Sequence, residues 1–247
     1  MKRHWKKIAI AVAALVVIVV GGSLLYTKVI NKPDPAFGQK DVNAKLDVAS
    51  TTLAPADTSA GAAAGTAAAA APAGSVDGVW NIKTGSEVGY RVKESINGFD
   101  TVANGRTQAV TGSIVIDGTK ITKGQFSVDM TTIKSDESRR DSQFNGRIMD
   151  VSQFPTSTFA LTQPIDLGQV PADGGSVKAS ATGDLTLHGT TNTVTFDVDG
   201  TFKNGLVGVL GQIPVVFADY GIPAPSFGPV RAEDNGLLEF VLVLQHA

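Results

Sequence analysis

Side chains that could support catalysis or metal binding are scarce in this chain, and one histidine is the main candidate. The sequence holds no cysteine and three histidines, of which only His188 lies away from the two ends. A hydrolytic triad needs a base beside a nucleophile, and no serine lies in a Gly-x-Ser-x-Gly elbow. A metal site needs further ligands, but His246 follows 58 residues later without a motif-like spacing. We therefore predict no catalytic residue, no metal and no cofactor, and we interpret His188 as the start of a hairpin corner that ends at Asn192.

A cluster of arginines is the second polar feature. The segment Asp136-Glu-Ser-Arg-Arg-Asp141 places two guanidinium groups among three carboxylates. One interpretation is a salt-bridge network that holds this segment to the domain, and the other is that Arg139 or Arg140 contacts the polar head group of a ligand. Tyr220 is likewise open to a packing role or a hydroxyl contact with a ligand. The sequence favours the salt-bridge and packing roles, and these three residues are the head-group candidates.

The elements that could carry these residues begin only after an unusual N-terminal region. Residues 8–27 form a run of 20 residues without a charge, with four basic residues before it and Lys28 and Lys32 after it. As a helix this run would span about 30 Å, so we predict a membrane anchor in residues 1–30 with its N-terminus in the cytoplasm. A cleaved signal peptide is the alternative, with Val20-Gly21-Gly22 as a small-residue site. Both interpretations place the rest of the chain outside the cytoplasm of a bacterial cell, as a single-pass membrane protein or an exported one.

Residues 31–75 have the composition of a linker. Ten alanines lie between residues 60 and 74 and are interrupted by glycine and proline. No apolar stripe is evident that could pack a helix, so we predict a disordered tether. A flexible chain of this length would have a reach of about 35 to 40 Å.

Residues 76–247 form the predicted folded domain. Its 13 lysines and arginines against 19 aspartates and glutamates give a formal charge of 13 − 19 = −6. Nucleic acids and anionic membrane surfaces are bound through clustered positive charge, so neither is an expected partner of this domain.

Apolar and polar residues alternate with a period of two along this domain, which is typical of half-buried antiparallel strands. Turn dipeptides such as Asp117-Gly118 and Asn204-Gly205 separate them. About eight strands connected by hairpins most simply close into an all-β barrel, with one short helical segment between residues 135 and 154. The strands are expected near residues 79–93, 103–117, 120–132, 156–163, 176–187, 193–203, 206–219 and 237–246.

The inward face of the predicted barrel is apolar and lacks charge. An eight-stranded barrel either fills its interior with side chains or holds one small ligand, and periodicity alone leaves both open. The last strand is apolar on both faces, so we predict that residues 135–154, with Phe144 and Ile148, cover its outer face. The residues that would line a ligand tunnel are Tyr90, Phe126, Met130, Phe159, Leu185, Phe196, Phe202 and Phe217, with Val209 as a further inward candidate.

Four pieces of the domain, in order, carry a resemblance to a known family. They are Trp80-Asn-Ile82, Arg139-Arg-Asp141 leading through Met149-Asp-Val-Ser-Gln-Phe-Pro155 to Thr158-Phe159, Gly183-Asp-Leu-Thr-Leu-His-Gly189, and Asp219-Tyr-Gly-Ile222. Together they resemble the YceI-like family of small exported, lipocalin-like barrels that bind polyisoprenoids or other long amphiphilic lipids. The resemblance covers residues 80 to about 244. It implies an antiparallel barrel around an apolar tunnel, with no cofactor, metal or established reaction.

Three functional hypotheses follow. The first is a membrane-tethered, extracytoplasmic binding protein that holds a long hydrophobic molecule for transport, storage or scavenging. The second is a structural or interaction module of the cell envelope whose barrel is filled by its own side chains. The third and weakest is a hydrolase that uses His188. The oligomeric state is not indicated by the sequence.

Overall fold

The computed structural model describes residues 33–51, 76–223, 225–226 and 228–247. The predicted membrane anchor at residues 8–27 and residues 52–75 of the predicted tether lie outside these ranges. Within them, no helix combines the length and the apolar character that crossing a membrane requires.

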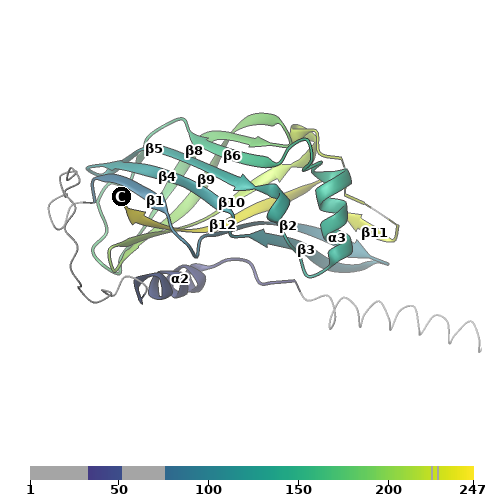
Figure 1. Cartoon of the computed structure of the whole chain (residues 1–247), viewed down its shortest axis with the longest axis horizontal. Coiled ribbons are helices and arrows are strands. Elements are labelled where there is room, and N and C mark those ends of the chain that lie inside the picture. The colour runs from purple at the N-terminus through teal and green to yellow at the C-terminus, as the bar shows by residue number, and fades with distance from the viewer. Residues whose placement is uncertain (1–32, 52–75, 224, 227) are drawn as a thin grey trace, which may run out of the picture.

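The folded domain is an all-β antiparallel barrel, as predicted (Figure 1). Eight strands follow one another around it in the order β1-β4-β5-β6-β8-β9-β10-β12, and pairing of β1 with β12 closes the ring. Strand β2 also pairs with β12, β3 pairs with β2, and the short β7 and β11 pair with β5 and β2. The strands are β1 (Gly78–Ile82), β2 (Glu87–Ile96), β3 (Phe99–Thr107), β4 (Val110–Asp117), β5 (Lys120–Asp129), β6 (Thr156–Leu161), β7 (Ile165–Asp166), β8 (Ser176–Leu187), β9 (Thr190–Lys203), β10 (Leu206–Val216), β11 (Val230–Ala232) and β12 (Asn235–His246).

Two of the predicted strands are each broken in two. The predicted strand 79–93 is β1 followed by β2, and the predicted strand 103–117 is β3 followed by β4. At the first break Ser86 is buried, and its Oγ accepts the backbone N–H of Val243 at 2.9 Å. The side chain of Ser86 thus replaces a strand partner for β12. The prediction of one continuous strand was wrong because the apolar residues stay in phase across this break.

A helix lies along the outer wall of the barrel where the sequence analysis placed a disordered tether. Helix α2 (Gln39–Thr51) buries three residues, Val42, Leu46 and Ala49, at the spacing of one helical face. We call residues 33–51 the strap. The prediction of disorder was wrong for this segment because a stripe of three apolar residues is too short to stand out from the polar residues around it.

The strap covers the outer face of the last strand. Val241 and Val243 of β12 are fully buried in a cluster with the apolar face of α2 and with β10. Gly208 of β10 allows the close approach, because a Cβ there would lie only 2.6 Å from Cγ1 of Val42. A cover was correctly expected, but its assignment to residues 135–154 was wrong. That segment lies at one end of the barrel instead (Figure 1).

Glu239 is a buried charge beneath the strap. Its side chain has no exposed surface, and its carboxylate accepts hydrogen bonds from Arg106 at 2.8 Å and from Arg91 at 3.2 Å. The same guanidinium groups donate to backbone carbonyls of the strap, Arg91 to Asp34 at 2.6 Å and Arg106 to Pro35 at 2.5 Å. One buried ionic cluster therefore joins β2, β3 and β12 to the strap.

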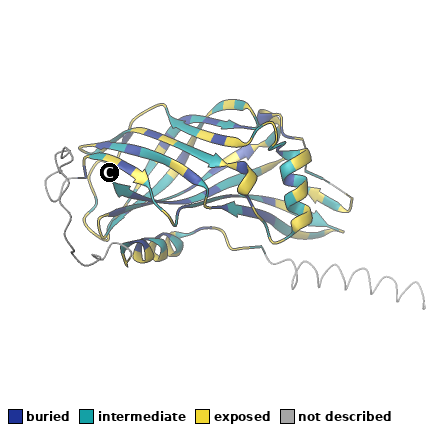
Figure 2. Cartoon of the chain, viewed as in Figure 1, coloured by how far each residue is buried: buried dark blue, intermediate teal, exposed yellow. Residues whose placement is uncertain are grey.

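Buried and exposed residues alternate along the strands of the barrel (Figure 2), whose two ends differ. At the end where β12 finishes, Trp80 is buried and its ring lies edge-on to Phe202 at 6.2 Å and to His246 at 5.2 Å. We call this the closed end. At the opposite end lie the β2–β3 hairpin and the short helix α3 (Ser138–Gln143), and we call this end the mouth.

We predict that Glu239→Ala destabilises the protein strongly. The substitution leaves Arg91 and Arg106 beneath the strap without their carboxylate, and breaking a buried ion pair in this way costs about 3 to 5 kcal/mol. The free energy of unfolding would be measured by urea denaturation. Lys120→Ala is the control, because its partner Asp166 is 4.0 Å away and both side chains are exposed. A loss for Glu239→Ala no larger than that of this control would contradict the assigned role.

Candidate functional site: an apolar cavity with a polar mouth

The barrel encloses a cavity of about 590 Å³. It is lined mainly by inward-facing apolar side chains, so the interior is not filled by the barrel's own residues. Phe202 was predicted to line this space, but it packs against Trp80 at the closed end and is not part of the lining. The predicted residues that do line the cavity are Tyr90, Phe126, Met130, Phe159, Leu185, Phe196 and Phe217, together with Val209.

Other residues that line the cavity were not predicted from the sequence. Strand β12 contributes Leu238, Phe240 and Leu242, which share its inward face. Because β12 is apolar on both faces, its alternation did not indicate which residues point inward. Ile114 and Ile165 also line the cavity, and both are buried. For Ile114, the available signal in the sequence was its spacing of two residues from Ile116, which is typical of one face of a strand.

Gly124 of β5 leaves space in the cavity wall. It lies on the same face of its strand as Phe126. A Cβ at this position would lie 3.5 Å from Cβ of Leu161 and 3.6 Å from Cγ2 of Ile114, which are ordinary contact distances. A side chain placed at residue 124 would therefore project into the cavity without meeting the backbone.

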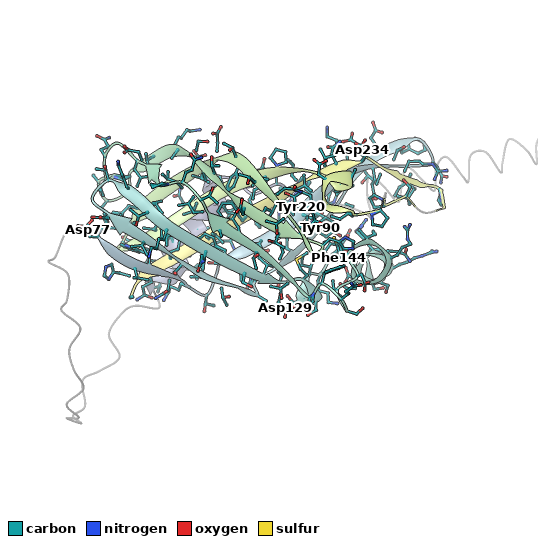
Figure 3. All side chains as sticks on the ribbon, turned by 90° about the horizontal axis from the view of Figure 1, so that it is seen from above. Asp77, Tyr90, Asp129, Phe144, Tyr220 and Asp234 are labelled. Carbon is teal, nitrogen blue, oxygen red and sulfur yellow. The ribbon has the colours of Figure 1, made fainter. Side chains whose placement is uncertain are left out.

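The mouth is covered by α3 and the π-helical turn η3 (Phe144–Ile148) that follows it. We call these two elements the mouth cover. Phe144 is buried, and its ring stacks on Tyr90 with the centroids 4.9 Å apart and the planes 8° from parallel (Figure 3). Phe144 and Ile148 face the cavity. Their apolar stripe was correctly recognised, but its partner is the inside of the barrel.

Arg140 holds the mouth cover to the barrel wall. It forms an ion pair with Glu94 of β2 at 3.5 Å and a second with Asp136. The Glu94 side chain is only 8% exposed, and this burial raises the pKa of Glu94 although Arg140 opposes the shift. Burial acts to lower the pKa of Arg140, but Glu94 and Asp136 raise it overall. Arg140 therefore stays charged, and the predicted salt-bridge network is present at this residue.

Two further arginines lie at the rim of the mouth. Arg139 and Arg147 both line the opening and are exposed. Arg147 donates from Nε to Oε1 of Gln143 at 3.2 Å and from a terminal nitrogen to the carbonyl of Ser226 at 3.4 Å. It thus connects the mouth cover to the loop before β11. The charged side chains of α3, η3 and β2 gather at this end of the cavity.

Tyr220, the third head-group candidate, is not brought to this site. It lies in the short helix η4 (Phe217–Tyr220) and packs inside the apolar cluster with 3% exposure. Among the described residues it is not one that lines the cavity. Burial raises the pKa of the Tyr220 hydroxyl. The packing role is the one that the structure shows.

His188 belongs to a tighter turn than predicted. His188 and Gly189, with φ of 51° and 75°, form a two-residue connection, and β9 begins at Thr190. Nδ1 of His188 lies 3.2 Å from the carbonyl oxygen of Tyr220, and its ring contacts Phe154 at 4.7 Å. The predicted five-residue corner was wrong, because polar residues at the start of β9 resemble a loop. His188 links the hairpin to η4.

We predict that Glu94→Gln changes how the stability of the protein depends on pH. A carboxyl whose pKa is raised by folding stabilises the protein when protonated, and this contribution is lost as pH rises through the raised pKa. Because the variant lacks this titration, its free energy of unfolding relative to that of the native chain should become more favourable as pH rises from the ordinary value of 4.5 toward neutral. Urea unfolding across this range would measure it, with the exposed Glu233→Gln as control. A difference between the variant and the native chain that stays constant over this range, or that moves against the variant as pH rises, would contradict the raised pKa of Glu94.

Comparisons with known proteins agree with this architecture. The YceI-like domain matches residues 80–244. UPF0312 proteins from Vibrio campbellii and Vibrio parahaemolyticus are each 28% identical over 148 residues, which cover 56% of this chain and 74% of each relative.

Two solved structures share the fold. A polyisoprenoid-binding domain from Saccharophagus degradans, implicated in plant cell wall breakdown, has a TM-score of 0.56 at 16% identity and covers 68% of this chain and 98% of its own. BcnA from Burkholderia cenocepacia has a TM-score of 0.52 at 21% identity, with coverage of 66% and 98%. The matched residues 80–244 include every residue that lines the cavity, and the chain belongs to the YceI-like family.

Proposed function

We propose that this protein binds one long hydrophobic molecule, a polyisoprenoid or a similar amphiphilic lipid, inside its barrel. The observation that carries this proposal is the apolar cavity of about 590 Å³ with charged residues gathered at its mouth. Such a space excludes water from a hydrocarbon chain and leaves a polar head group at the surface. The polyisoprenoid-binding domain from Saccharophagus degradans, which has the same fold, supports this class of ligand.

The cavity volume limits the length of chain that fits. At roughly 30 Å³ for each water-sized group, about 590 Å³ holds roughly 20 carbon atoms. Burying each methylene contributes about 0.8 kcal/mol, so a chain of this length readily offsets the cost of association. Binding therefore needs few specific contacts along the chain.

The head group belongs at the rim of the mouth. Arg140 is held by two carboxylates, which neutralise its charge. We assign the contact with an anionic or polar head group to Arg139 and Arg147, because both residues are exposed and line the opening.

The competing functions find less support. A structural module with a self-filled core does not account for the cavity. A hydrolase based on His188 does not fit the position of this residue, because its ring lies in a turn against Phe154 and Nδ1 lies beside a backbone carbonyl.

We further propose that the protein acts outside the cytoplasm and is tethered to the cell membrane by residues 8–27. The uncharged run of 20 residues and the basic residues before it support this location, and cleavage of the run would give an exported form. Transport, storage and scavenging of the lipid are all compatible with such a carrier.

We predict that Gly124→Leu blocks the cavity. The added side chain projects between Leu161 and Ile114, where a Cβ meets only ordinary contacts, so uptake should weaken by roughly tenfold or more while the fold is retained. The fragment 33–247 would be extracted with solvent, incubated with geranylgeraniol and examined by native mass spectrometry. Gly124→Ala is the matched control and should bind nearly as the native fragment does. Unchanged uptake by Gly124→Leu would place the ligand elsewhere, and an absence of uptake by the native fragment would end the proposal.

We also predict a limit in chain length. Affinity for geraniol, farnesol and geranylgeraniol should rise by roughly fourfold for each additional buried carbon, because each contributes about 0.8 kcal/mol. It should level off for longer polyprenols once the cavity is full. Competition titrations on the same fragment measure the series. An affinity that does not depend on chain length would show that the cavity does not hold the chain.

A further inference from the structure

The strap shortens the connection between the barrel and the uncharged N-terminal run. A tether beginning at residue 31 would let the barrel take any orientation, but the strap attaches the chain to the barrel wall from Asp34 onward. Five residues, 28–32, separate Thr27 at the end of the run from Pro33, the first described residue. At about 3.4 Å per residue, the seven steps from Thr27 to Asp34 span at most about 24 Å.

Asp34 lies nearer the mouth than the closed end. Its backbone carbonyl accepts from Arg91 of β2 at 2.6 Å. Arg91 is five residues from the mouth end of β2 at Ile96, whereas its partner in β12, Leu237, is nine residues from the closed end at His246. At about 3.3 Å per residue these separations are roughly 17 Å and 30 Å. From Asp34 the strap runs toward the closed end (Figure 1).

We propose that the mouth of the barrel faces the membrane and that its rim is an interaction surface for lipid. This proposal rests on the proposed function and its membrane anchor. The strand tilt of a barrel shortens the two separations along its axis to about 13 Å and 23 Å. With the mouth toward the membrane, the linker from Thr27 to Asp34 is longer than the distance that it must span. With the closed end toward the membrane, the linker of at most about 24 Å must be fully extended, which costs conformational entropy at every residue.

The rim offers an apolar path between the lipid surface and the cavity. Ile96 of β2 pairs with Val230 of β11, and both line the cavity at its outer edge. The exposed Arg139 and Arg147 stand at the same opening, at the level where lipid head groups would lie. A hydrocarbon chain can therefore pass between bilayer and barrel without full exposure to water. The lipid is exchanged with the membrane that carries the anchor.

Single cysteines test this orientation, because the chain has none of its own. Asp100→Cys places a label beside the β2–β3 hairpin at the mouth, and Asp117→Cys places one in the β4–β5 hairpin at the closed end; both aspartates are exposed. Oδ1 of Asp77 accepts a hydrogen bond at 2.6 Å from the backbone N–H of Gly118 in the β4–β5 hairpin. Figure 3 shows Asp77 at the opposite end of the barrel from Phe144. The full chain, labelled with a fluorophore, would be reconstituted in phosphatidylcholine vesicles with spin-labelled head groups.

The label at residue 100 should be quenched several-fold more than the label at residue 117. A long Gly/Ser insertion between Lys32 and Pro33 leaves the strap docked but frees the barrel, so it should abolish the difference. Val42→Asp with Leu46→Asp, which undocks α2, should do the same. Equal quenching of the two labels in the native chain, or stronger quenching at residue 117, overturns the orientation.

The separate failures can be told apart. A full chain that does not sediment with vesicles overturns the anchor and the orientation together. Lipid uptake is measured independently on the fragment 33–247, so a barrel that binds lipid but shows no preference between the labels refutes only the orientation.

Discussion

Strand β12 is packed on both faces, and the rest of the structure depends on how each face is covered. Its inward residues Leu238, Phe240 and Leu242 form part of the cavity wall, while Val241 and Val243 lie outward under the strap. Without the strap, the outward face would leave an apolar strip in water at a cost proportional to its area. The same strand pairs with β10 along one edge and with β1 and β2 along the other, which closes the barrel.

The contacts that stabilise this protein surround the cavity, because the interior itself is not filled by side chains. An unfilled apolar interior forfeits contacts that a packed core would make. The closed end compensates with a dense cluster around Trp80, and the outer wall does so with the strap and with the ionic cluster around Glu239. At the mouth, the stack of Phe144 on Tyr90 and the pair of Arg140 with Glu94 hold a short cover in place. Space for a ligand is thus compatible with a well-defined barrel.

The strap also changes what the N-terminal region can do. A free tether only limits distance, whereas a helix docked along the wall fixes the direction in which the chain leaves the barrel. Buried ionic groups serve this purpose well, since Glu239, Arg91 and Arg106 satisfy one another and the carbonyl of Asp34 only when the strap is in register. The position of the strap on the barrel is therefore set by this ionic cluster together with the apolar contacts that cover β12.

The sequence by itself determined the antiparallel barrel and several of the large residues that line the cavity, because a period of two assigns residues such as Phe126 and Phe196 to one face of a strand. It did not place Phe202, because position along the barrel axis does not appear in the alternation. Only the tertiary structure decided that the interior is unfilled, that Phe144 turns toward Tyr90, and that the strap docks on β12. Each of these depends on which surfaces meet across long sequence separations, and local pattern carries no information about that.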